Sequence, residues 1–125
     1  MAPSSPQAGR PANLPHRLKR RAEFLRVAAK GRKAPMPGLV LQAMARGDDA
    51  PARLGFTVTK RVGNAVVRNR TRRRLKEAAR LEMAAAPAIG ADLVLIGRDG
   101  TAKRDFAALR QDFARALAKT GIARQ

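Results

Sequence analysis

The sequence predicts an α+β protein in which a mainly antiparallel sheet and the helices packed on it form two layers. Three observations favour this class. Apolar and polar residues alternate over residues 53–60, as in a half-buried strand. Residues 92–98 are almost continuously apolar, as in a buried strand, while residues 60–80 and 106–117 carry apolar residues at helical spacing. The 125 residues suffice for one domain with one modest core.

The N-terminal segment lacks the apolar residues that a core needs. Residues 1–16 are rich in Pro, Ser, Ala and Gln, which predicts a disordered tail ending at His16, the single histidine. A single domain is then expected over residues 17–121. Residues 122–125 are expected to fray.

The domain is predicted to begin with a helix over residues 18–30. Phe24 lies on its apolar face, and Gly31 is placed to end it as a C-cap. The next element is a strand over residues 38–45, because prolines precede it and a Gly-Asp-Asp turn follows it.

The strand over residues 53–60 has two different faces. Leu54 and Phe56 point into the core. The other face has two readings, a surface for hydroxyl contacts with a sugar-phosphate chain or an ordinary solvated face of an antiparallel sheet. If the neighbouring strand keeps its register, this second face includes Thr57, Thr59, Val40 and Gln42.

The most informative stretch is residues 60–80, KRVGNAVVRNRTRRRLKEAAR, with nine Lys and Arg residues and one acid, Glu77. A helix through it has a buried stripe that includes Val67 and Leu75, with cations on the opposite side. Ordinary solvated faces mix both signs of charge. A face with so little acid therefore predicts a polyanionic partner.

The start of this helix is also predicted. Gly63 supplies backbone freedom, and Asn64 is a residue type that caps helices. Arg68 and Arg70 lie near the N-terminus, where a cation opposes the helix macrodipole. Their position indicates a role other than helix stability, and the planar fork of arginine suits phosphate.

The chain is predicted to end with a strand and a helix. The strand over residues 92–98 pairs with the strand over residues 53–60 through a βαβ crossover, for which general statistics favour the right hand. Asp105 can cap the last helix. Its core residues recur at helical spacing and are Phe106, Leu109, Phe113 and Leu117.

The charge and the aromatic content narrow the mode of binding. A compact chain with a net charge of +18 repels itself, so nucleic acid is the expected neutralising partner. With only four aromatic residues, all Phe, backbone contacts should outweigh base stacking, and affinity should fall steeply with salt. There is no Cys, no apolar run that could span a bilayer and no signal-peptide core. We expect a cytoplasmic protein with no membrane partner and no evident protein partner.

No catalytic residues and no metal ligands are predicted. Two-metal cleavage of a phosphodiester needs several carboxylates that converge on the ions. Of the nine acids only Asp48 and Asp49 are adjacent, and they lie in a predicted turn. With one His, no Cys and no Gly-rich phosphate loop, the other common centres are absent from the sequence.

The run KRVGNAVVRNR followed by TRRRLKE resembles the signature of the bacterial ribonuclease P protein subunit, in which Arg-Asn-Arg opens a basic helix. The resemblance implies a ribosomal protein S5 domain 2-like fold with an uncommon left-handed βαβ crossover and the order α-β-β-β-α-β-α. A short edge strand around residues 32–34, which the sequence alone does not reveal, completes this order. The resemblance also implies a catalytic RNA subunit and precursor tRNA as partners, with Mg²⁺ held by the RNA.

The hypothesis is therefore a ribonuclease P protein that assists removal of the 5′ leader from precursor tRNA. The alternative is a small basic ribosomal RNA-binding protein, and a nucleoid-type DNA binder and an independent nuclease are further rivals. The expected RNA-binding residues are Lys60, Arg61, Asn64, Arg68, Asn69, Arg70, Arg72, Arg73 and Lys76. The leader cleft that the resemblance implies consists of Phe24, Val40, Gln42, Thr57 and Thr59.

Three positions qualify this assignment. Asn64 either fixes the Gly-Asn turn or, like Asn69, contacts RNA or a hydrated metal ion. Many members of the resembled family carry a second aromatic residue at the position of Ala28, so the stacking surface should be smaller here. Arg74 stands where an apolar residue is common in the family, and its methylenes are expected to cover the core with the charge in water.

Overall fold

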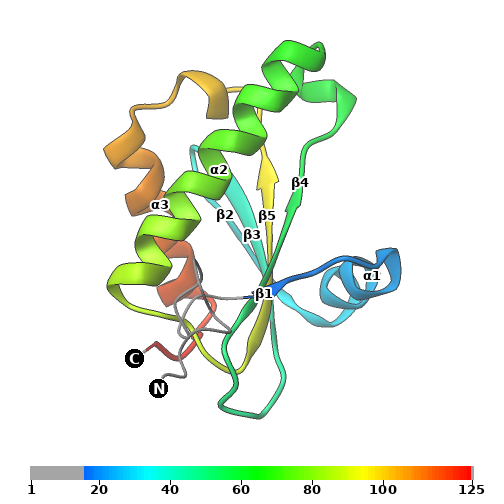
Figure 1. Cartoon of the computed structure of the whole chain (residues 1–125), viewed down its shortest axis with the longest axis vertical. Coiled ribbons are helices and arrows are strands. Elements are labelled where there is room, and N and C mark those ends of the chain that lie inside the picture. The colour runs from blue at the N-terminus through cyan, green and yellow to red at the C-terminus, as the bar shows by residue number, and fades with distance from the viewer. Residues whose placement is uncertain (1–15, 125) are drawn as a thin grey trace, which may run out of the picture.

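The computed structural model describes residues 16–124, which form one sheet with helices on both faces (Figure 1). The strands are β1 (His16–Arg17), β2 (Arg32–Pro35), β3 (Leu39–Ala45), β4 (Arg53–Thr57) and β5 (Ala91–Gly97). The helices are α1 (Arg21–Lys30), α2 (Ala65–Ala85) and α3 (Phe106–Lys119), with the short 3-10 helices η2 (Lys60–Val62) and η3 (Thr101–Lys103). The α+β class and the order of elements after β1, including β2, are confirmed.

The sheet is mixed, with the strand order β1-β4-β5-β3-β2. β3 pairs antiparallel with β2 and β5, whereas β4 pairs parallel with β5 and β1. The segment β4–α2–β5 is thus the predicted βαβ unit. In Figure 1, α2 lies in front of the sheet while both strands run upward and β5 lies to the left of β4. The crossover is therefore left-handed, as the resemblance implies.

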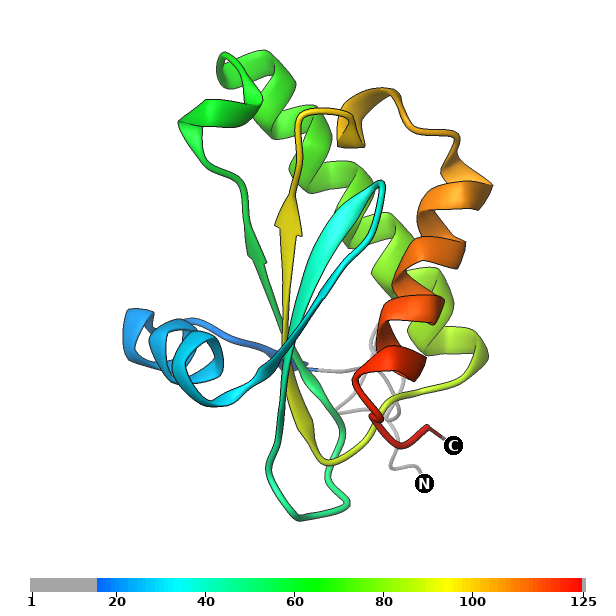
Figure 2. The same cartoon turned by 180° about the vertical axis from the view of Figure 1, so that it is seen from behind.

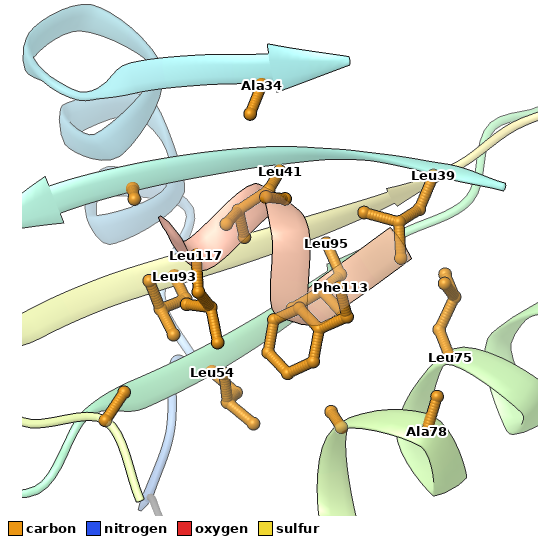
Figure 3. Close-up of a cluster of buried hydrophobic side chains, with 14 of the residues drawn as sticks. Ala34, Leu39, Leu41, Leu54, Leu75, Ala78, Leu93, Leu95, Phe113 and Leu117 are labelled. Carbon is orange, nitrogen blue, oxygen red and sulfur yellow. The ribbon is translucent and has the colours of Figure 1, made fainter. Parts of the chain in front are cut away.

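α2 and α3 cover one face of the sheet and enclose the main core (Figure 2). Every second residue of β3 faces this core, and Leu39 and Leu41 are fully buried. Figure 3 shows these side chains in one cluster with Leu75 of α2 and Phe113 of α3. Removal of this apolar surface from water is the main force that holds the two layers together.

α1 lies against the opposite face and buries one residue, Val27. Val27 packs with Leu18 and Val94 in a second, smaller cluster. Because α1 covers only part of this face, Val40 and Gln42 of β3 stay half-buried. The face beside α1 is therefore accessible to a ligand, whereas the face beneath α2 and α3 is closed.

The N-terminal end of the described chain is tied to β4, which corrects two predictions. His16, which the sequence assigned to the tail, pairs as β1 with Arg53 of β4. The Leu18 amide then donates a hydrogen bond to the Leu54 carbonyl (2.8 Å), so residue 18 is extended chain and α1 starts at Arg21. The remaining residues of the predicted tail, 1–15, lie outside the described residues.

The C-terminal residues 122–124, which were predicted to fray, form hydrogen bonds with the rest of the domain. The Ile89 amide donates to the Ala123 carbonyl (3.0 Å), and the Arg124 guanidinium donates to the Ala86 carbonyl (2.8 Å) and to the Glu82 carbonyl (3.1 Å). These bonds fasten the chain end to the α2–β5 connection. Residue 125 lies outside the described residues.

Candidate nucleic-acid interface

The start of α2 is fixed by the predicted Gly-Asn turn. Gly63 has a φ of 152°, and a Cβ at this position would lie 3.0 Å from the Val67 side chain. The Asn64 side chain accepts a hydrogen bond from the Val67 amide (3.0 Å), which confirms it as the N-cap. This turn fixes the direction of α2 and thereby positions the first cations of the helix.

α2 has the two sides that its sequence predicts. Thr71, Leu75 and Ala78 are fully buried against the sheet. On the other side the cations Arg70 and Arg73 are exposed. The helix therefore presents guanidinium groups to solvent while its apolar stripe holds it in place.

The predicted RNA-binding cations meet no acid within the protein. Among residues 16–124, none of these seven side chains forms a salt bridge, namely Lys60, Arg61, Arg68, Arg70, Arg72, Arg73 and Lys76. Six of the nine acids do form salt bridges, with other arginines, namely Glu23, Asp48, Glu77, Glu82, Asp92 and Asp112. The acids therefore neutralise arginines outside this set. The seven cations stay positive, and we call the surface that they form the α2 surface.

Arg68 has a further unmatched donor. Its Nε is buried and has no hydrogen-bond partner among the described residues. Buried donors are normally paired, because an unpaired one costs free energy. The side chain of the next residue, Asn69, accepts a bond from the Arg72 guanidinium one turn further along the helix (3.3 Å), so Asn69 orients a cation. A change of the Arg68 side-chain rotamer would be needed to bring this donor to an anion in solution.

Arg17 adds a cation that the sequence analysis missed. It lies on β1, and its guanidinium is 5.4 Å from the centre of the Phe56 ring. Burial lowers the pKa of Lys76, and the nearby charges of Arg17 and Arg72 lower it further. The basic surface therefore extends from α2 onto β1. The sequence carried no signal for this, because β1 is only two residues long.

Arg74 does not belong to this surface, and the prediction that its charge stays in water is wrong. Its guanidinium donates to the Thr101 carbonyl (2.8 Å) and to the Arg104 carbonyl, and lies 5.9 Å from the centre of the Phe106 ring. Arg74 thus fastens α2 to η3 and to the start of α3.

Four of the five predicted leader residues share the face of the sheet beside α1. Across the sheet, Val40 and Thr57 both pair with Ile96, so the three form one row. The next row pairs Gln42 with Val94 and Val94 with Gly55. A Cβ at Gly55 would lie 2.5 Å from the Phe24 ring, so the absent side chain lets α1 pack closely there. We call the surface formed by Phe24, Val40, Gln42 and Thr57 the open sheet face.

The fifth residue, Thr59, lies just beyond this face. β4 ends at Thr57, not at residue 60 as predicted, because the chain turns into η2. Thr59 is exposed and lines a shallow pocket of about 530 Å³ together with Arg61 and Ile96. This pocket joins the open sheet face to the cations at the start of α2.

An ion-pair network at the base of the sheet positions α1. Asp92, which is 1% exposed, binds Arg46 (2.7 Å) and Arg53 (2.7 Å). Arg53 also binds Glu23 of α1 (2.8 Å). Hydrogen bonds from the amides of Arg20 and Lys19 lower the pKa of Glu23 to about 2, with a smaller contribution from Arg53. The network therefore links α1, which carries Phe24, to two strands.

Residues 16–124 contain neither a cluster of metal-ligating side chains nor a membrane-spanning helix. No three His, Cys, Asp or Glu side chains come together there as a metal site would require. None of the helices in this range is long and apolar enough to cross a membrane.

Comparisons with known proteins agree with this geometry. The family model described as "Ribonuclease P" matches residues 13–121. The chain is 66% identical over 111 residues to the ribonuclease P protein component of Gluconacetobacter diazotrophicus, covering 89% of this chain and 96% of that protein. It is 52% identical over 109 residues to the component of Paramagnetospirillum magneticum, covering 84% and 82%. The ribonuclease P protein of Thermotoga maritima superposes with a TM-score of 0.70 at 28% identity, covering 83% and 96%.

Proposed function

Because the chain belongs to the ribonuclease P protein family, we propose that its α2 surface binds the catalytic RNA subunit and that its open sheet face binds the 5′ leader of precursor tRNA. Family membership makes the chain a protein component of ribonuclease P and a participant in tRNA processing. The division of these two RNA contacts between two surfaces is our proposal.

The observation that carries the proposal is the lack of acids around the cations of α2. The seven predicted RNA-binding cations form no salt bridge with any carboxylate among residues 16–124, and Glu77 of α2 binds Arg80, which lies outside this set. Arginine binds phosphate through two parallel hydrogen bonds, and each phosphate neutralised releases counterions. The α2 surface therefore suits a folded RNA, and its affinity should depend strongly on salt concentration.

The open sheet face suits a single strand without a fixed sequence. Thr57 and Gln42 offer hydrogen-bonding groups, while Val40 and the Phe24 ring offer apolar contact. A single strand exposes bases, sugars and phosphates together. Such a mixed surface can hold leaders of different sequence.

We assign the chemistry to the RNA. Mg²⁺ prefers carboxylate oxygens and water, and six of the nine carboxylates of the chain are held by arginines. The described residues thus offer no donor set that fits a catalytic Mg²⁺, and we propose that the RNA subunit holds the metal. The protein would then act where this RNA and precursor tRNA are, in the cytoplasm.

Reconstitution tests the proposal. The protein is mixed with the cognate RNA subunit at low Mg²⁺ concentration, and cleavage of precursor tRNA is measured against RNA alone and protein alone. We expect cleavage with the mixture and little with either component. Cleavage by RNA-free protein would contradict the assignment of chemistry to the RNA.

The ribosomal alternative has less support, because the family match and the curated relatives are ribonuclease P proteins. Sedimentation of a cell extract separates the two. The protein should travel with one structured RNA of the tRNA-processing machinery and not with ribosomal subunits.

A further inference from the structure

A second basic region lies at the opposite end of the sheet from the start of α2. A pocket of about 650 Å³ opens there between α1, the strands β2 and β3, and the end of α3. Its lining includes four cations and an apolar side chain, namely Arg26, Lys30, Arg32, Arg46 and Met44. We call it the distal pocket.

The four cations of the distal pocket differ in their partners. Arg46 binds Asp48 (3.0 Å) and Asp92 (2.7 Å), so its charge is neutralised. The side chains of Arg26, Lys30 and Arg32 are exposed and form no hydrogen bond or ion pair with any residue in the range 16–124. Three uncompensated positive charges therefore line one concave surface.

The ends of two helices also border the pocket. Lys30 ends α1, and Thr120 and Gly121 follow α3. A helix C-terminus carries roughly half a negative charge, so the two ends together offset about one of the three positive charges. The distal pocket remains positive and favours an anion.

β3 connects the distal pocket with the open sheet face. Val40, Gln42 and Met44 alternate along one side of β3, and Met44 lines the pocket. The seven residues of β3 span about 20 Å. At about 3.4 Å for each stacked nucleotide, this length corresponds to about six nucleotides. A strand lying along the open sheet face from the α2 end would thus reach the distal pocket.

We propose that the distal pocket binds backbone phosphates of the distal part of a single-stranded RNA leader, through Arg26, Lys30 and Arg32. This inference rests on the proposed function of the open sheet face and adds a length requirement to it. Short leaders end on the sheet face, whereas longer ones also place phosphates in the pocket. Leader length then determines affinity even though leader sequence does not.

The test compares two variants that each lose three positive charges. The pocket variant is Arg26→Gln, Lys30→Gln, Arg32→Gln. The control variant is Lys19→Gln, Lys103→Gln, Arg115→Gln, whose side chains are exposed and lie outside the pocket. Each protein is reconstituted with the RNA subunit, and the dissociation constant for precursor tRNA is measured with leaders of about 2, 6 and 12 nucleotides, lengths chosen from the spacing along β3.

With the longest leader we expect the pocket variant to bind about tenfold more weakly than the control variant, and its plot of log affinity against log salt to be less steep by about 2. With the shortest leader the two variants should bind equally. Equal affinities at every length would overturn the proposal. A loss independent of leader length, accompanied by weaker binding of the RNA subunit alone, would also overturn it, because the phosphates would then belong to the RNA subunit.

A variant with conservative changes guards against an effect on folding. Arg26→Lys, Arg32→Lys keeps the charge and should restore the length dependence if phosphates are bound. Measurements on the wild-type protein distinguish failure of the proposed function from failure of this inference. If the affinity of the wild-type protein for precursor tRNA did not change between no leader and a leader of about 12 nucleotides, the open sheet face itself would be rejected as the leader site.

Discussion

The arginines of α2 and the arginines at the base of the sheet have the same side chain in opposite surroundings. Arg46 and Arg53 share the buried carboxylate of Asp92. Arg68 and Arg70 meet no carboxylate in the described part of the chain. The comparison teaches that a net charge of +18 says less about function than the positions of the few acids. Acids accompany Arg46 and Arg53, which hold the fold, whereas the arginines that we propose to bind RNA have no acid partner within residues 16–124.

Arg46, Arg53 and Asp92 form what we call the structural group. The largest effect should come from removing its acid. Asp92→Asn leaves two guanidinium groups without their shared carboxylate at a buried site. We expect the free energy of unfolding to fall by about 3 kcal/mol, because loss of one partner of a buried pair leaves the other uncompensated. Urea unfolding measures this change. The control Asp49→Asn, at an exposed acid, should change stability by less than about 0.5 kcal/mol; equal effects of the two variants would show that burial of the pair is unimportant.

The second effect concerns the seven predicted RNA-binding cations around the start of α2, which we call the RNA-binding group. Arg68→Ala combined with Arg70→Ala should weaken binding of the RNA subunit about 10- to 100-fold, with a salt dependence less steep by about 2. Stability should stay the same or rise slightly, because both cations oppose the macrodipole and alanine favours helix. Filter binding and circular dichroism measure the two properties. Loss of the helical signal would assign these arginines to the structural group instead.

A third effect depends on pH. The pKa of Glu23 is about 2 in the folded protein, below its ordinary value of 4.5. The stability that Glu23 contributes is therefore complete above about pH 4.5 and is lost as the pH falls towards 2. The difference in unfolding free energy between the wild type and Glu23→Gln should be largest near neutral pH and should shrink over this window. A difference that stays constant from pH 7 to 2 would mean that the Glu23 charge does not hold α1.

The smallest effect should come from the acid that lies on α2 itself. Glu77 binds Arg80 at the surface (2.7 Å), where such a pair contributes little to stability. Glu77→Gln removes the only acid of residues 60–80 and should strengthen RNA binding by less than about threefold.

Glu82, on the same helix, binds Arg110 and Arg124. Glu82→Gln should instead lower stability and leave RNA affinity unchanged, so that a reversed result would contradict the separation of the two groups.

Local patterns of sequence were sufficient to predict the amphipathic helix α2 and the turn before it. The helical spacing of Val67 and Leu75 and the turn at Gly63 and Asn64 depend on residues close together in the chain. The structure confirms the turn and the burial of Leu75, whereas Val67, in the first turn of the helix, is half-buried. Alternation along residues 53–60 likewise identified the two faces of β4, although η2 shortens the strand. The left-handed crossover came only from the family resemblance, because periodicity does not depend on handedness.

Contacts between distant residues could not be predicted in the same way. Arg74 binds carbonyl groups of residues 101 and 104, and Arg124 binds those of residues 82 and 86. Nothing in the sequence around either arginine distinguishes it from an exposed one. Asp92 was predicted to lie in a buried strand, but its two arginine partners come from the ends of two other strands. The same limit hid the distal pocket, which joins residues from α1, β2, β3 and the end of α3.

The central position of β5 has a consequence for synthesis of the chain. β5 lies between β3 and β4, yet it is the last strand to leave the ribosome. Until residue 97 has emerged, β3 and β4 lack their common neighbour, while the cationic α2 segment is already outside. The nascent chain thus exposes its cationic helix before the sheet can close. Release of β5 and α3 then completes folding and buries the apolar surface of the core.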